Sequence, residues 1–187
     1  MELITILFFA LSSFFTQEHS PIIADKTTVT IQPQSQQIKI TQENLFTIIH
    51  KDDDLKVVEE QQTALFSKAQ QNTAWAKELN RFTDKTITFS STDNQLNAHI
   101  TLTYHDKTDL RALGVWYDAQ HNQFSINHVP NDNLQTKDGQ RLGNYWVFGG
   151  GKAFNFTLEP FEALPTDYKS TDYQKYSIPI AVILDEN

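Results

Sequence analysis

Alternation of apolar and polar residues is the clearest pattern in the chain. Residues 96–104 (LNAHITLTY) place Leu, Ala, Ile, Leu and Tyr on one side and polar residues on the other. This period of two is typical of a half-buried β-strand. The same alternation predicts strands within residues 27–40 and at 45–49 and 86–90. Pro33 interrupts the first of these, which indicates an edge, a bulge or a turn.

Short strand candidates continue through the second half of the chain, separated by turn-forming clusters. They are residues 115–117, 123–129, 144–148 and 153–158. Residues 176–184 (YSIPIAVIL) alternate again, and we expect an apolar final strand with nothing after it to cover its free edge. Many short strands at this spacing predict an antiparallel sandwich or barrel.

One stretch, residues 58–82, follows a different period. It is rich in helix formers, and its apolar residues recur at spacings of three and four. We therefore expect one amphipathic helix or two short ones. The predicted fold class is mainly β with one helical insertion, in a single β-rich domain that covers residues 25–187.

The chain begins with an uncharged apolar run, residues 3–15 (LITILFFALSSFF). This run matches the apolar region of a secretory signal and is shorter than the roughly 20 residues of a membrane-spanning helix. The usual basic residues before it are absent, because Glu2 is the only charge there; a buried N-terminal helix is the alternative. We interpret residues 1–24 as a signal peptide that is cut between Ser20 and Asp25, and we expect an exported protein without membrane insertion.

Composition narrows the range of functions. A net charge of −8 and a pI near 5.1 argue against a nucleic-acid partner, since no basic stripe is available to neutralise phosphates. The chain has no cysteine, which excludes disulfides and thiol chemistry. Its 13 Phe, 6 Tyr and 3 Trp supply large side chains for the core of a sheet protein.

The glycine run Gly149-Gly150-Gly151-Lys152 suggests a phosphate-binding loop at first sight. That motif needs glycine at 146 and a hydroxyl residue at 153, where this chain has Trp146 and Ala153. We therefore interpret the run as a bend or bulge between two strands.

Other candidate sites have a structural interpretation as well. The histidines lack zinc-site spacing, and Asp52-Asp53-Asp54 lacks the rest of a calcium loop and is expected to form an exposed acidic turn. No G-x-S-x-G turn is present. The aromatic strand at 145–148 (YWVF) could line a sugar-binding groove, but such strands more often belong to the core. We expect no catalytic residue, no metal site and no cofactor.

Together these features resemble a chaperone-usher fimbrial subunit, in which a signal peptide precedes a run of short strands and an apolar last strand. The lack of cysteine is similar to the alpha class, which includes the common-pilus major fimbrillin and the CFA/I type. The passages that carry the resemblance are residues 28–31 (TVTI), 153–158 (AFNFTL), 166–168 (TDY) and 176–184.

The resemblance implies an immunoglobulin-like antiparallel β-sandwich that lacks its final strand and receives residues 25–32 of a neighbouring subunit as a donor strand. The implied donor residues are Ile23, Val29 and Ile31. The implied lining of the acceptor groove is Ile178, Ile180 and Val182. The implied partners are neighbouring copies or other pilus subunits, a periplasmic chaperone and an outer-membrane usher.

The leading hypothesis is therefore a structural subunit of a cell-surface fimbrium, with a possible adhesive role. The alternative is a periplasmic binding protein, or an immunity-type inhibitor, of a Gram-negative bacterium, because a small acidic exported domain with an aromatic surface would suit that role equally well. An enzyme ranks third, since no constellation of residues supports one.

Overall fold

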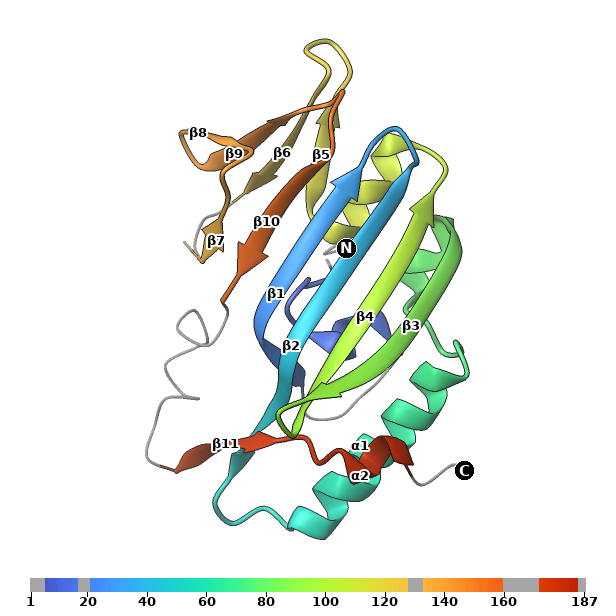
Figure 1. The fold of residues 1–187 in the computed structure, drawn as a ribbon, viewed down its shortest axis with the longest axis vertical. Helices are drawn as coiled ribbons and strands as arrows, with labels where there is room; N and C mark the ends of the chain where they lie inside the picture. The colour runs from blue at the N-terminus through green and yellow to red at the C-terminus, as the bar shows by residue number, and fades with distance from the viewer. Residues whose placement is uncertain (1–5, 17–20, 128–132, 160–171, 185–187) are drawn as a thin grey trace.

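Two antiparallel sheets and one helical insertion make up the part of the chain described by a computed structural model, namely residues 6–16, 21–127, 133–159 and 172–184. Figure 1 shows the larger sheet in face view, with the smaller sheet beside one end of it and the main helix behind the other. The prediction of a mainly β, antiparallel sandwich with one helical insertion is confirmed.

The large sheet has the strand order β3-β4-β2-β1-β10-β7, and β11 pairs with the far end of β2. All of its pairs are antiparallel. Its strands are β1 (Ile22–Gln32), β2 (Gln37–His50), β3 (Phe82–Thr92), β4 (Gln95–Tyr104), β7 (Leu134–Gln135), β10 (Phe154–Leu158) and β11 (Tyr173–Ser177).

The small sheet has the order β5-β6-β9-β8 and consists of β5 (Val115–Asp118), β6 (Gln123–Asn127), β8 (Gln140–Leu142) and β9 (Tyr145–Gly149). Phenylalanine rings join it to the large sheet. Phe148 of β9 stacks on Phe154 of β10 with ring centroids 4.3 Å apart, and Phe124 of β6 lies 5.4 Å from the same ring. The aromatic residues counted in the sequence thus form the junction between the two sheets.

The helical insertion consists of α1 (Leu55–Gln70) and the 3-10 helix η2 (Lys77–Arg81), which matches the expectation of two short helices better than one long helix. Asp54 caps α1, because its side chain accepts a hydrogen bond from the Lys56 amide at 3.0 Å. The Phe66 ring of α1 contacts the Phe89 ring of β3 at 5.0 Å. The other helices are η1 (Leu11–Phe14), η3 (Lys107–Leu113) and α2 (Ala181–Leu184).

Strand β2 is the longest strand and changes its buried side along its length. Ile38, Ile40 and Gln42 point into the core as even-numbered residues, but beyond Asn44 the odd-numbered Leu45 joins the same core. Asn44 has a φ of 53°, a left-handed conformation that asparagine tolerates. The segment predicted as a separate strand at 45–49 is therefore the continuation of β2 after this bend.

The expectation of a free apolar strand at 176–184 is wrong. Strand β11 ends at Ser177 and pairs with β2, and α2 begins at Ala181. Pro179 has no amide hydrogen to donate to a sheet ladder, so the strand cannot continue past it on both sides. The sheet is closed here rather than open, because the Ile178 amide donates to the Leu45 carbonyl at 3.0 Å.

Residues 6–16 lie in the core of the folded chain. Leu11 and Phe14 have no exposed surface, and Ile6 is 2% exposed. The assignment of residues 1–24 to a signal peptide stays a prediction, and the structure adds that part of this segment packs against the domain. Among the described residues, no helix has both the length and the apolar character to cross a membrane.

Candidate functional site

The outer side of the small sheet carries the largest group of exposed apolar side chains in the described part of the chain. Trp116 is 47% exposed, Leu142 57% and Tyr145 44%. The strand register puts Trp116, Ser125, Val147 and Gln140 in one row and Asn127, Tyr145 and Leu142 in the next. We call these seven residues the Trp116 face.

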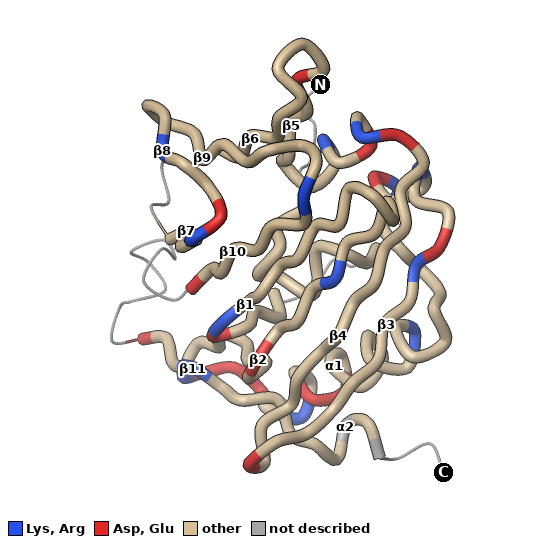
Figure 2. The backbone as a smooth tube through the Cα atoms, turned by 45° about the horizontal axis from the view of Figure 1, so that its top comes forward, with Lys and Arg blue, Asp and Glu red and all other residues tan. Residues whose placement is uncertain are grey.

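The two rows of the Trp116 face contain no charged residue. Figure 2 shows that the strands of the small sheet are almost free of charged residues, and Asp118 of β5 and Arg141 of β8 are the two exceptions. Arg111 of η3 lies at the border, with its guanidinium carbon 5.1 Å from the centre of the Trp116 ring. Exposed Trp and Tyr beside an Arg, with few charges in the middle, is the composition of the centre of a protein interface.

The opposite side of the same strands is fixed by the core. Val115, Phe124 and Phe148 are buried there, and Trp146 is partly buried against them. Because one side is held by close packing, the side chains of the Trp116 face project from a rigid support. The period of two therefore separates Tyr145 from Phe148 on a single strand, and the sequence interpretation of 145–148 as core is correct for only part of it.

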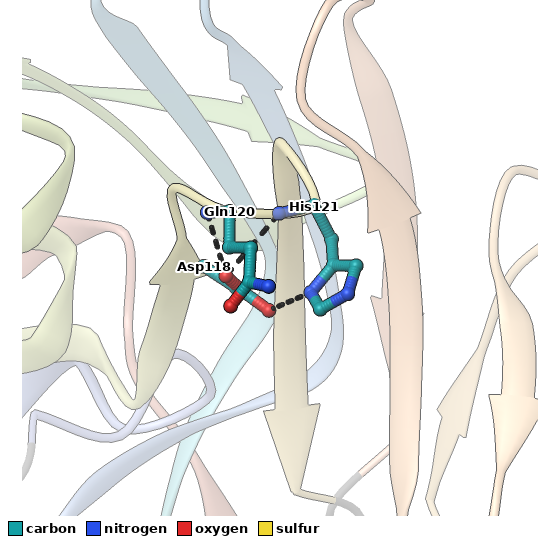
Figure 3. Close-up of polar contacts among 3 residues, drawn as sticks. All are labelled: Asp118, Gln120 and His121. Carbon is teal, nitrogen blue, oxygen red and sulfur yellow. Dashed lines mark hydrogen bonds and ion pairs between the residues drawn. The ribbon is translucent and has the colours of Figure 1, made fainter.

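A carboxylate and an imidazole meet in the turn between β5 and β6 (Figure 3). The Nδ1 atom of His121 lies 2.6 Å from Oδ2 of Asp118, and the Gln120 and His121 amides donate to Oδ1 of Asp118 at 2.9 and 3.3 Å. The hydrogen bond from His121 holds the pKa of Asp118 below its usual value, with help from the two amides. No item of nucleophilic chemistry is added by the printed partners of this pair, so the contacts describe a stabilised exposed turn.

A second histidine lies on the outer side of the large sheet. The Nε2 atom of His99 is 2.8 Å from the Ser90 hydroxyl, and its Nδ1 is 3.5 Å from the Thr41 hydroxyl. No carboxylate is a printed partner of this histidine, and the three residues lie on an open sheet face rather than in a cavity. The arrangement lacks the acid that orients the base of a hydrolytic triad.

The glycine run forms the bend that the sequence predicts. The Gly150 amide donates to the Asn122 carbonyl at 2.7 Å, and a Cβ atom at position 150 would lie 2.6 Å from that oxygen. Glycine is needed here because the two backbones approach too closely for a side chain. Residues 149–154 line a shallow depression with Asn122 and Asp138.

The acidic run at 52–54 serves the backbone rather than a metal. Asp53 accepts the His50 amide at 2.7 Å, and Asp54 is the cap of α1. Within the described ranges, no three His, Asp or Glu side chains are grouped so that they could hold a metal ion.

The residues that the fimbrial resemblance assigns to a donor strand lie inside the protein's own sheet. Ile23, Val29 and Ile31 belong to β1, are at most 3% exposed, and lie in a strand that pairs with β2 on one side and β10 on the other. Of the groove residues, Ile178 is 2% exposed and Ile180 is half-buried, between β11 and α2. Val182 lies in α2, and its side chain is outside the described part.

Comparison of the chain with protein-family models, with curated proteins and with solved structures finds no match. Function is therefore inferred from the chain's own surface and contacts.

Proposed function

We propose that this protein is a non-catalytic binding protein that docks a protein partner through the Trp116 face. The observation that carries the proposal is the exposure of Trp116, Leu142 and Tyr145 on one rigid sheet face whose two rows contain no charge. Trp, Tyr and Arg dominate the binding energy of protein interfaces, and their side chains lose little conformational entropy when they are already held by a sheet.

The border of the face adds direction to the proposal. Arg111 and Arg141 are cations of a chain whose net charge is −8, and both lie on the elements that surround Trp116. A partner with an acidic rim around an apolar centre would complement this arrangement, which agrees with the binding or inhibitory role considered from the sequence.

Site-specific photo-crosslinking in the native cell tests the proposal. A photoreactive amino acid at Leu142, the most exposed apolar position, should give one adduct of defined mass, and the same amino acid at Thr88, on the outer side of the large sheet, should give none. The Leu142 adduct should weaken when Trp116 is changed to Ala. Equal adducts at both positions, or an adduct unaffected by Trp116→Ala, would contradict the proposal.

The fimbrial-subunit hypothesis makes a different prediction. Since Ile23, Val29 and Ile31 are buried in a strand with two partners, donation would require β1 to leave β2 and β10. Purified protein should then form polymers that resist mild denaturation. A monomer that stays monodisperse at high concentration would exclude polymerisation by this route and leave the binding proposal in place.

A further inference from the structure

Residues 6–16 fill a groove on the inner side of the large sheet. The side chains of Leu11 and Phe14 have no exposed surface. The Phe8 ring meets the Phe156 ring of β10 edge-on, with centroids 5.4 Å apart. The groove therefore receives large apolar side chains at several points along one short segment, as a peptide-binding groove does.

Backbone hydrogen bonds connect the segment to three distant parts of the chain. They involve η3, the start of β1 and the loop between α1 and η2. Segments that bind by main-chain hydrogen bonds gain affinity from the ladder and specificity from the side-chain pockets. The bonds run from Ile6 N to Ala112 O at 2.9 Å, Ala24 N to Phe9 O at 3.0 Å, Ala76 N to Phe14 O at 2.8 Å and Thr16 N to Ala74 O at 2.8 Å.

A buried amide inside the groove recognises the segment. Gln42 of β2 has no exposed surface, and its Nε2 donates to the Phe8 carbonyl at 2.8 Å. The Oε1 atom of Gln42 and the hydroxyl of its register neighbour Thr27 have no hydrogen-bond partner among the described residues. A buried amide is costly unless it is bonded, so the position of Gln42 makes sense when a peptide carbonyl lies opposite it.

We propose that this groove is a binding site for an apolar peptide segment, that residues 6–16 occupy it within the chain, and that it holds them after the chain is cut between Thr16 and Pro21. The signal-peptide hypothesis concerns where the chain is cut. The groove concerns where the released piece goes. Cutting removes the covalent connection alone, because every contact described above lies on the two sides of the cut.

The test uses the full chain with a protease recognition sequence inserted between Thr16 and Pro21 and cut after folding. Residues 1–16 should elute with the remainder on size-exclusion chromatography and be identified by mass. An isotope-labelled peptide of residues 6–16 should then exchange into the complex. The same peptide with Leu11→Asp and Phe14→Asp should not exchange, because two carboxylates cannot enter an apolar groove.

Two variants of the full chain separate recognition from general stability. Gln42→Met keeps the size of the side chain but removes the donor to Phe8, and it should weaken retention of the cut segment about tenfold. Gln62→Met changes another buried glutamine, which has no bond to the segment among the described contacts, and should leave retention unchanged.

Two results would overturn the proposal. The first is loss of residues 1–16 on cutting while the melting temperature of the remainder stays the same, since the groove would then not need its occupant. The second is equal exchange of the native and the doubly substituted peptide, which would show adhesion without a site.

Discussion

The two sheets have opposite kinds of outer surface, although both bury their inner sides by the same alternation. Across the large sheet, the register lines up Thr157, Thr28, Thr41, His99 and Thr88, which are polar. Across the small sheet, it lines up Trp116, Ser125, Val147 and Gln140. Threonine suits a solvated strand because its branched side chain fits the pleat and its hydroxyl bonds water.

This difference shows that alternation alone does not decide what an outer face does. The large sheet follows the rule of apolar residues inside and polar residues outside, whereas the small sheet keeps large apolar residues on both sides. Exposed apolar side chains gathered in one place indicate a contact surface, while single ones are ordinary. Four changes would break or sharpen the comparison.

The largest effect is expected beneath the Trp116 face. Phe148→Ala removes a buried ring that stacks on Phe154 and should lower the free energy of unfolding by about 3–5 kcal/mol. Tyr145→Ala, on the same strand but on the outer side, should change it by less than about 1 kcal/mol. Urea denaturation of both variants measures the difference, and similar losses would mean that the two sides of β9 are equally packed.

The large sheet has a buried phenol whose titration gives the second effect. Burial raises the pKa of Tyr104 to about 12, and its side chain is 1% exposed. In the unfolded chain this phenol ionises near pH 10, so stability is present below that pH and falls as the pH rises toward 12, by up to about 2–3 kcal/mol.

Tyr104→Phe should remove this part of the alkaline loss, and denaturation followed between pH 9 and 12 measures it. Because the Tyr104 hydroxyl has no partner among the described residues, the variant should cost little at pH 7. An unchanged pH profile would mean that the phenol reaches solvent.

The third change exchanges the character of one outer face for the other. Trp116→Thr should alter the free energy of unfolding by no more than about 0.5 kcal/mol, since the ring is half exposed. It should lower the affinity for the partner by about 2 kcal/mol, or roughly 30-fold. Calorimetry with the crosslinked partner measures this, with Thr88→Ala as the control on the polar sheet. An equal effect from Thr88→Ala would remove the distinction between the faces.

The smallest effect concerns the turn beside the Trp116 face. The pKa of Asp118 is lowered by its bond to His121, so the turn's contribution to stability is present above the ordinary carboxyl range and is lost as the pH falls through the lowered pKa. His121→Ala should return the carboxyl titration toward its ordinary midpoint, which NMR can follow. A midpoint that does not move would assign the shift to the backbone amides.

Local pattern was enough to predict most of the strands. The alternating segment at 96–104 is β4, and those at 86–90 and 153–158 lie in β3 and β10. The order of strands was not predictable, because pairing of β1 with β10 joins residues more than a hundred positions apart and leaves no local signal. The last strand failed for a local reason, since Pro179 was treated as part of an alternating run.

The candidate site was hidden by a correct rule applied too broadly. Aromatic residues at 145–148 were assigned to the core as a block, although a period of two must send Tyr145 and Phe148 to opposite sides. Placing Trp116 beside Tyr145 also required the register of β5, β6 and β9, which follows from long-range packing. The groove around residues 6–16 had even less signal, because an apolar run looks the same in a leader and in a core.

Strand β2 pairs with β1, β4 and β11, and this has a consequence for the order of folding. The first partner is the preceding strand, but the last one emerges from the ribosome only after about 120 further residues have been made. Until then, the edge of β2 between Phe46 and His50 has no partner from the C-terminal end, and an open apolar edge invites pairing with other chains. The final residues of this protein therefore act as the closing step of its synthesis.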